Sequence, residues 1–211
     1  MKVAIVSCGG LCPGLNVVIR EIFMCLKYNY KVEDVYGVMW GYNGFTDPES
    51  WVKLTSAIVK DIHTKGGSII GAARGGFDAK AIVRSLKERG INMLFALGGD
   101  GTHQALNLLI KEINSQNLEI ACCGIPKTID NDIPIIDRSF GYETSCEIAR
   151  QIIQSANTEA ECAPNGVGIV KVMGRDSGFI AMNASTASRD VNFCLIPEQK
   201  YEIEGEHGFL S

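Results

Sequence analysis

Two acids and a lysine gather where an apolar run of the sequence ends. Lys127, Asp130 and Asp132 lie within the stretch GIPKTIDND, which follows the apolar residues LEIACC. A carboxylate on a rigid loop at the end of a strand can take a proton from a hydroxyl nucleophile, and a second carboxylate can orient the first or order water around Mg²⁺. If this loop stood alone, both acids would be read as solvated turn residues.

Two glycine-rich stretches offer places for a phosphate group. The residues GGLCPGLN at 9–16 join a predicted strand to a predicted helix, where glycine lets the backbone approach an anion and the helix N-terminus offers free N–H groups. A purely structural turn explains this loop equally well. The residues GGDGT at 98–102 surround Asp100 with three glycines, which leaves room for a polyphosphate and its Mg²⁺. Unrelated kinases share this second motif, so it indicates a phosphate donor and no more.

Two arginines also follow apolar runs. Arg74 comes after IIGAA, and Arg175 lies in MGRDSG at 173–178. A guanidinium keeps its charge and can bond two phosphate oxygens together, so either residue suits a transferring phosphoryl group. A lone arginine is usually a solvated surface residue, but the glycines, acids and arginines at successive strand ends together favour phosphoryl transfer.

The elements that must position these residues alternate between strand and helix. Continuous apolar runs predict strands covered on both faces: KVAIVSC, VYGVMWG, SIIGAAR, NMLFALGG and LEIACCGIP. Helical spacing over 16–28, 79–90 and 103–114 predicts helices between several of them. The alternation predicts an α/β fold with a parallel, doubly wound, Rossmann-like sheet, whose ligands bind beyond the carboxyl ends of the strands.

The strand and helix pattern resumes in the last third of the chain. The runs GIVKVMG and NFCLIPE predict two further strands, with a helix from Phe179 to Ser188 between them. We therefore predict one α/β domain over residues 1–140 and a second, incomplete α/β domain over residues 141–211.

Composition argues against several classes of protein. The chain has 211 residues, of which 46% are hydrophobic and 21% charged, as in ordinary globular proteins. A net charge of −4 without a Lys/Arg cluster argues against nucleic-acid binding. No apolar run reaches the roughly 18 residues that cross a bilayer. Eight cysteines without a Cys-x-x-Cys pair, and no secretory signal, predict a reduced, cytoplasmic protein.

Five motifs together resemble a known family. GGLCPGLN, GGDGT, PKTIDND, DRSFGYET and VKVMGRDSGFIA are similar, in order and spacing, to those of the phosphofructokinase family, and most closely to its plant-like and protist-like branch. The resemblance implies a glycolytic 6-phosphofructokinase, which transfers the γ-phosphoryl group of ATP to the 1-hydroxyl of fructose 6-phosphate with Mg²⁺. It also implies that residues 1–140 bind the donor, that 141–211 form part of the sugar-phosphate site, and that the protein is a homo-oligomer.

The family pattern implies a role for each matching residue. Asp130 becomes the base that removes the proton of the sugar hydroxyl, and Asp100 and Asp132 belong to the magnesium site. The implied catalytic residues are Lys127, Thr128, Asp130 and Arg175. The residues implied at the donor phosphates are Gly10, Arg74, Gly99, Gly101 and Thr102. Those implied at the sugar phosphate are Thr128, Ile129, Asp130, Met173, Gly174 and Arg175.

The identity of the donor depends on two positions that point in different directions. In the family, glycine at the position of Gly101 resembles ATP users, because an acid there would crowd and repel the α-phosphate. Lysine at the position of Lys127 resembles pyrophosphate users. Plant-like ATP enzymes combine the two, so we favour ATP and keep a pyrophosphate-dependent phosphofructokinase as the alternative.

Two departures from the family pattern leave further alternatives. Bacterial members have an arginine from a neighbouring subunit where Gly166 stands, so the sugar phosphate must be held from elsewhere or weakly. The family's remaining substrate residues lie in a C-terminal part that this sequence lacks. An inactive fragment is therefore one alternative, and a non-catalytic regulatory partner that binds phosphorylated ligands is another.

Overall fold

The computed structural model describes residues 1–206 and 208, and the chain divides into two compact units, Met1–Thr128 and Ile129–Ser211. The division lies before the boundary predicted near residue 140. The reason is local bonding, because the side chain of Asn131 bonds to Asp137 and Ser139, and the hydroxyl of Ser177 bonds to Asp130. Residues 129–140 therefore belong to the second unit.

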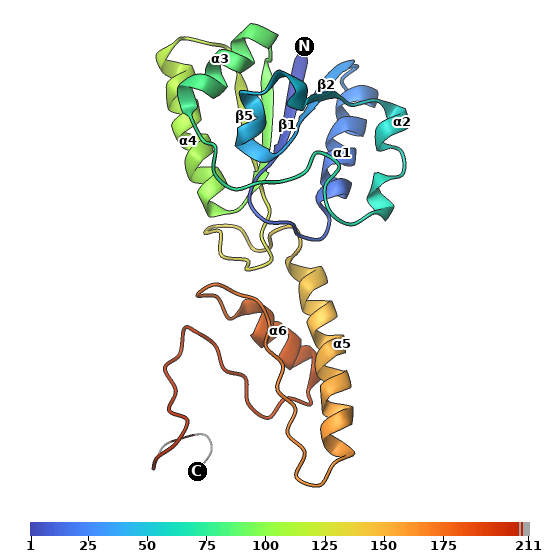
Figure 1. Ribbon diagram of the computed structural model, residues 1–211, viewed down its shortest axis with the longest axis vertical. Helices are drawn as coiled ribbons and strands as arrows, with labels where there is room; N and C mark the ends of the chain where they lie inside the picture. The colour runs from blue at the N-terminus through green and yellow to red at the C-terminus, as the bar shows by residue number, and fades with distance from the viewer. Residues whose placement is uncertain (207, 209–211) are drawn as a thin grey trace. The chain divides into compact units, whose positions relative to one another are not determined.

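The first unit is built on a five-stranded sheet with helices on both faces (Figure 1). Its strands are β1 (Lys2–Ser7), β2 (Asp34–Val38), β3 (Trp51–Lys53), β4 (Met93–Gly98) and β5 (Ala121–Pro126). They lie in the order β3-β2-β1-β4-β5, and all pairs are parallel except β2 with the short edge strand β3. The predicted doubly wound parallel sheet is confirmed, although the three-residue strand β3 was not foreseen.

The central strand β1 shows why an uninterrupted apolar run predicts such a sheet. Val3 to Val6 are fully buried, because helices cover both faces of the strand. In the register of the sheet Ser7 pairs with Leu97, and the N–H of Cys8 donates to the carbonyl of Leu97 at 2.8 Å. The loops that come after β1 and β4 therefore start side by side.

Three longer helices cover the sheet of the first unit. Figure 1 shows α1 (Leu15–Tyr28) on one face and α3 (Ala79–Arg89) with α4 (Asp100–Ser115) on the other. The predicted helices over 16–28 and 79–90 are confirmed, and Gly90 ends α3 in the left-handed conformation (φ 67°). The shorter helical segments are η1 (Gly41–Phe45), η2 (Pro48–Ser50), α2 (Ser56–Val59) and η3 (Ile62–Thr64).

Helix α4 begins three residues earlier than its apolar spacing predicted. Gly99 precedes its first turn, and the carbonyl of Gly99 accepts hydrogen bonds from the N–H groups of Thr102 (3.0 Å) and His103 (3.2 Å). The prediction missed this turn because Asp100, Gly101 and Thr102 carry no apolar side chain. Most of the GGDGT motif is therefore a helix N-terminus and not a loop.

The strand predicted over SIIGAAR does not form. In the sheet β1 already pairs with β2 on one side and β4 on the other, so no edge of β1 remains for another strand. The segment makes a single bridge, between Ala73 and Cys8, just beyond the end of β1. This bridge nevertheless brings the residue before Arg74 to the first glycine-rich loop.

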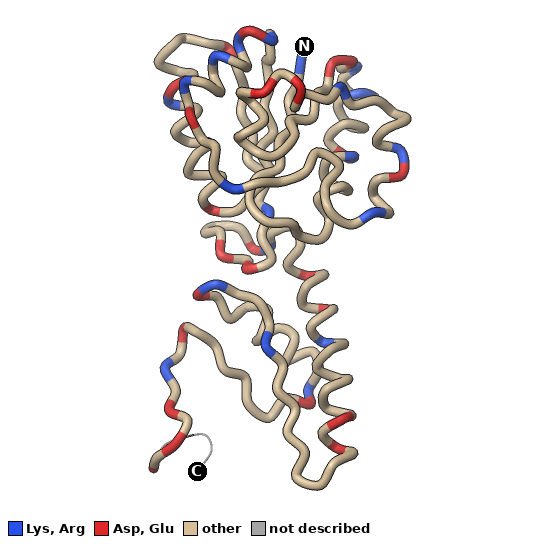
Figure 2. The backbone as a smooth tube through the Cα atoms, viewed as in Figure 1, with Lys and Arg blue, Asp and Glu red and all other residues tan. Residues whose placement is uncertain are grey.

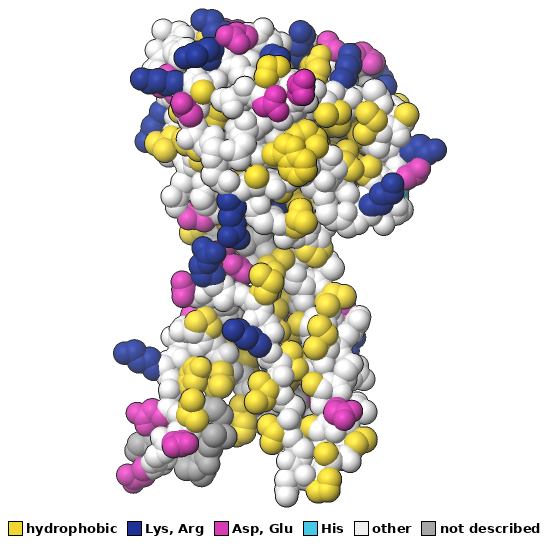
Figure 3. Space-filling model, viewed as in Figure 1, with side chains coloured by type: hydrophobic (Ala, Val, Ile, Leu, Met, Phe, Trp, Pro, Cys, Tyr) yellow, Lys and Arg dark blue, Asp and Glu magenta, His cyan; other side chains and the backbone are white. Residues whose placement is uncertain are grey.

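The second unit contains α5 (Tyr142–Glu161) and α6 (Phe179–Ser188), which share a small apolar core. The prediction of α6 is confirmed, whereas α5 was not predicted. The strands predicted over 168–174 and 192–198 are absent from the described residues, because no neighbouring strand is there to pair with them. Figure 3 shows hydrophobic side chains at the surface of this unit, and Val167 and Ile169 are 82% and 88% exposed.

Charged residues of both signs are interspersed along the outer elements of the first unit (Figure 2). Most of the ion pairs lie at the surface, such as Lys53 with Asp34 at 2.7 Å. Pairs of this kind contribute about 0–1 kcal/mol each, so the buried sheet and helices hold the unit together. In the described part of the chain, every helix is too short or too polar to cross a membrane.

Candidate active site

A buried lysine joins the ends of three strands in the first unit. Lys127 comes directly after β5 and is only 5% exposed. Its backbone N–H donates to the carbonyl of Gly98 at the end of β4 (2.9 Å), and its ammonium donates to the carbonyl of Gly10 after β1 (2.6 Å). Because a buried ammonium must have partners, these bonds fix the lysine between the two glycine-rich motifs. The structure therefore places Lys127 between the two glycine-rich motifs for which the sequence predicted phosphate binding, and its role there stays a prediction.

The loop after β1 is shaped by glycines and bordered by an arginine. Gly9 has a left-handed backbone (φ 85°), and its N–H donates to the carbonyl of Ala73 at 2.9 Å. A side chain at Gly9 would come within 3.6 Å of the Lys127 ammonium, and one at Gly10 within 3.7 Å of the Arg74 guanidinium. The loop thus brings exposed backbone and two cationic groups together, which is the chemistry that holds phosphate oxygens.

The N-terminus of α4 lies next to Lys127 and the loop after β1. Thr102 is buried, and its carbonyl accepts a hydrogen bond from the hydroxyl of Tyr42 at 3.1 Å. Gly99 lies beside the residues that follow β5, since a side chain at Gly99 would meet Thr128 and the carbonyl of Lys127 within 4 Å. The unit therefore brings together Gly10, Arg74, Gly99, Thr102, Lys127 and Thr128, and Gly101 lies in the first turn of α4.

We expect Gly98→Ala to destabilise the first unit. A Cβ atom at Gly98 would lie 2.1 Å from Oγ1 and 2.3 Å from Cβ of Thr102, and the buried Thr102 has no room to move away. Overpacking of this kind costs about 1–3 kcal/mol of unfolding free energy. Urea denaturation measures it, with Gly101→Ala as the matched control, because a Cβ atom at Gly101 meets nothing within 4 Å. Equal stability of the two variants would contradict this account.

Asp100 is the predicted magnesium-site acid that lies in the first unit. It is exposed in the first turn of α4, and its carboxylate accepts a hydrogen bond from Gln104 at 2.5 Å. Among the described residues, no three His, Cys, Asp or Glu side chains cluster as metal ligands. This donor set still fits Mg²⁺, which proteins commonly hold through one or two carboxylates while water and substrate phosphates supply the rest.

In the second unit, one hydrogen bond connects two motifs that lie far apart in the sequence. The hydroxyl of Ser177 donates to the carbonyl of Asp130 at 2.6 Å across 47 residues. Ser177 is 6% exposed, so this contact is internal. The TIDND loop and the MGRDSG loop are therefore held together, with Asp130 in one and Arg175 in the other. Ile129 also belongs to this unit and packs against the core of α5 and α6.

The MGRDSG loop is tightly turned around its glycine. Gly174 has a φ of 148°, and a side chain there would lie 2.1 Å from the carbonyl of Ser177. Only glycine fits such an approach. The flanking side chains of Met173 and Arg175 are exposed, as is Asp132 in the other loop. All three are thus available to a ligand, as their predicted roles require.

The structure gives a packing reason for Gly166. A Cβ atom at this position would lie 2.1 Å from the carbonyl oxygen of Ala160, a backbone atom near the end of α5. The N–H of Gly166 also donates to Ala163 at 3.1 Å. An arginine cannot stand here unless the loop changes its path.

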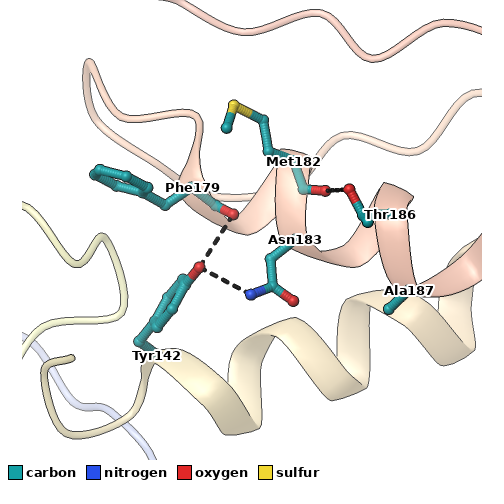
Figure 4. A pocket seen from close by; sticks show the side chains of 6 residues that line it. All are labelled: Tyr142, Phe179, Met182, Asn183, Thr186 and Ala187. Atoms are coloured by element: carbon teal, nitrogen blue, oxygen red, sulfur yellow. Dashed lines mark hydrogen bonds between the residues drawn. The ribbon is translucent and has the colours of Figure 1, made fainter. Parts of the chain in front are cut away.

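A pocket of about 360 Å³ beside the start of α5 was not foreseen from the sequence (Figure 4). The Tyr142 hydroxyl accepts a hydrogen bond from Asn183 at 3.2 Å and donates to the carbonyl of Phe179 at 3.4 Å. Burial raises the pKa of the Tyr142 hydroxyl above its ordinary value. The motif DRSFGYET contains Tyr142, but neither its type nor its spacing indicates a role.

The thiol of Cys8, at the start of the first loop, is expected to resist alkylation. Burial raises its pKa from 9.0 to about 12, so its reactive thiolate is roughly a thousandfold scarcer at pH 8 than that of an ordinary cysteine. Cys25, Cys123, Cys162 and Cys194 are exposed and should react first with iodoacetamide. Peptide mass spectrometry after brief labelling of the folded chain measures the order. Early labelling of Cys8 would contradict the buried assignment.

Comparison with known proteins agrees with the motifs. A family model described as "Phosphofructokinase" matches residues 2–207. The "ATP-dependent 6-phosphofructokinase 7" of Arabidopsis thaliana is 52% identical over 98% of this chain and 42% of its own length. The "ATP-dependent 6-phosphofructokinase" of Borreliella burgdorferi is 50% identical over the whole chain and 47% of its own length. The chain thus spans less than half the length of these relatives.

A solved structure has the same fold. The crystal structure of Pichia pastoris phosphofructokinase in the T-state aligns with 89% of this chain and 21% of that one, with a TM-score of 0.77 and 25% sequence identity. The match to a phosphofructokinase structure supports the α/β fold described above.

Proposed function

This chain belongs to the phosphofructokinase family, and from that premise we propose that it supplies the phosphoryl-donor site and the general base of an ATP-dependent 6-phosphofructokinase. The observation that carries the proposal is the hydrogen bond from Ser177 to Asp130. It keeps a loop with a carboxylate beside a loop with a guanidinium. A hydroxyl that loses its proton next to a phosphate needs both groups.

In the proposed reaction the carboxylate of Asp130 accepts the proton of the 1-hydroxyl of fructose 6-phosphate. That oxygen attacks the γ-phosphorus of ATP and forms the new O–P bond. The bond between the γ-phosphorus and the β–γ bridging oxygen breaks, and ADP leaves with its electron pair. Fructose 1,6-bisphosphate and ADP are the products, and the proton passes from Asp130 to solvent.

The remaining residues bind and orient the two substrates. Lys127, Arg74 and the backbone at Gly10 face the donor phosphates, together with the first turn of α4 that holds Gly99, Gly101 and Thr102. Thr128, Ile129, Met173, Gly174 and Arg175 face the sugar phosphate, and Arg175 also stabilises the charge on the transferring group. Asp100 and Asp132 would each offer a carboxylate to Mg²⁺, which would supply neutralisation of the charge on the donor phosphates.

ATP is favoured as the donor because Gly101 is open. A Cβ atom there would meet nothing within 4 Å, and this space lies in the first turn of α4. Pyrophosphate is the second candidate, favoured by the buried ammonium of Lys127 beside Gly9 and Gly10. An extra cation near the donor suits a small, highly charged anion.

One parallel assay tests the proposal and separates the two donors. Fructose 6-phosphate and Mg²⁺ are supplied with either ATP or pyrophosphate, and fructose 1,6-bisphosphate is measured. We expect product with ATP alone, and product with pyrophosphate alone would reverse the assignment of the donor. If neither donor gives product, a chain extended to the length of the relatives is assayed in the same way. Inactivity there too would favour a non-catalytic regulatory role.

We further propose that the protein works as a homo-oligomer in the cytoplasm. Symmetric assembly is the rule among soluble oligomers, and the free thiols of the described cysteines suit a reducing compartment. Size-exclusion chromatography with light scattering tests the first statement, and a fluorescent fusion tests the second.

A further inference from the structure

The backbone around Asp130 is held by a neighbouring residue whose role the proposed function leaves open. We propose that Asn131 is a positioning residue that fixes the carboxylate of Asp130 through a cyclic set of hydrogen bonds. We call this set the Asn131 clasp: Asn131 bound to Asp137 and Ser139, with Ser177 bound to Asp130. The inference rests on the proposed role of Asp130 as the base.

The clasp begins with an unusual backbone conformation. Asn131 has a φ of 53°, in the left-handed region that few residues other than glycine adopt. Asparagine tolerates this region better than most side chains, because its amide bonds locally to the backbone. The chain bends at Ile129 and Asp130 and continues directly into Asn131, so the left-handed backbone of Asn131 helps to set the direction of the base.

The side chain of Asn131 uses both ends of its amide. Its Nδ2 donates to the carbonyl of Asp137 at 3.0 Å. Its Oδ1 accepts from the N–H of Ser139 at 2.8 Å and from the hydroxyl of Ser139 at 3.2 Å. Ser139 is 5% exposed, so water does not compete freely for these bonds. They close the segment 131–139 into a ring.

The second part of the clasp reaches Asp130 itself. The buried hydroxyl of Ser177 donates to the carbonyl of Asp130 at 2.6 Å. The backbone of Asp130 is therefore held at its carbonyl by Ser177, and the residue that follows it is held by the ring that Asn131 forms with Asp137 and Ser139. Catalytic groups must be held within about 0.5 Å of their productive geometry, and loops reach this precision only through such support.

The substitution Asn131→Gly separates the side chain from the backbone. Glycine adopts the left-handed conformation without strain, so the backbone can keep its path while the three hydrogen bonds of the amide are lost. We expect turnover to fall by about 10- to 100-fold, because a displacement of about 1 Å at a reacting group costs up to about 100-fold. The KM for ATP should stay within about twofold, since the donor residues belong to the first unit.

Asn165→Gly is the matched control. Asn165 also has a left-handed backbone (φ 54°) in the second unit, and it is exposed. Its side chain makes no hydrogen bond to another described residue. Asn165→Gly therefore makes the same chemical change without breaking side-chain hydrogen bonds, and we expect this variant to have the turnover of the parent.

Amide hydrogen exchange reports the clasp independently of activity. The N–H of Ser139 bonds to Asn131 Oδ1, so its exchange should accelerate by at least about tenfold in Asn131→Gly and remain slow in Asn165→Gly. Unchanged exchange would overturn the clasp, and so would faster exchange with parental turnover. If Asn131→Gly does not fold, Ser177→Ala replaces it and must lower turnover without changing the KM for ATP.

A third variant, Asp130→Asn, distinguishes failure of the clasp from failure of the proposed function. Both variants and Asp130→Asn are assayed in a chain length that forms fructose 1,6-bisphosphate. Full activity of Asp130→Asn would refute the role of Asp130 as the base. The positioning role proposed for Asn131 would then be refuted too. An inactive Asp130→Asn beside a fully active Asn131→Gly would overturn the clasp alone.

Discussion

Asp130→Asn is expected to lower the turnover of fructose 6-phosphate by about 100- to 10,000-fold, the range that general bases contribute. Asparagine has the size of aspartate but cannot accept the hydroxyl proton. The Ser177 hydroxyl bonds to the backbone carbonyl of residue 130, so the loop should keep its shape. Steady-state kinetics measures the change, and isothermal titration with a non-hydrolysable ATP analogue should show donor affinity within about threefold of the parent.

Asp190→Asn serves as the control for this prediction. Asp190 is exposed after α6, and its carboxylate accepts a hydrogen bond from the hydroxyl of nearby Ser188. The variant loses the same charge from the same unit, so its turnover should remain parental. Turnover of Asp130→Asn close to that of this control would refute the base assignment.

Gly101→Asp is expected to keep or raise the stability of the first unit while it weakens the use of ATP. The added side chain has room, because a Cβ atom at Gly101 meets nothing within 4 Å. Residue 101 lies in the first turn of α4, where an acid stabilises the helix by about 0.3–1 kcal/mol and removal of glycine contributes about as much again. Urea denaturation should therefore show equal or greater stability than the parent.

The same carboxylate would repel a nucleotide. A unit negative charge about 5 Å from a phosphate oxygen costs roughly 3 kcal/mol at an effective dielectric constant of about 20, which corresponds to about a hundredfold loss. We expect kcat/KM for ATP to fall by that order while pyrophosphate is affected far less, since it has no α-phosphate bearing a nucleoside. Gly101→Ala tests bulk without charge and should keep ATP use. If Gly101→Asp left kcat/KM for ATP unchanged, the nucleotide could not bind beside residue 101.

Sequence periodicity was enough to predict the four parallel strands of the first unit and its helices α1 and α3, because the physical causes of these elements are local. Val3 to Val6 are buried on both faces, and the apolar stripe of α3 ends at Gly90, which takes the left-handed conformation that a cap needs. The start of α4 was missed because Asp100 to Thr102 contribute no apolar side chain. Residues 68–74 have the composition of a strand but no free edge of the sheet to join.

Residue types predicted which side chains are candidates for chemistry, but not what holds them in place. Lys127 and Asp130 stand out from an apolar run, whereas Asn131 and Ser177 are ordinary loop residues in the sequence. Their roles depend on contacts across 8 and 47 residues, which no local pattern reports. The same is true of Tyr142 and Asn183, which meet across 41 residues.

The span of the bond between Ser177 and Asp130 also sets an order of assembly during synthesis. The residues proposed to bind the donor all lie within Met1–Thr128, so that unit can fold as soon as it leaves the ribosome. Asp130 emerges directly afterwards, but its carbonyl has no Ser177 to bond until 47 more residues have been added. On the proposed function, a nascent chain would therefore complete its donor-binding unit well before Asp130, the proposed base, is fixed in place.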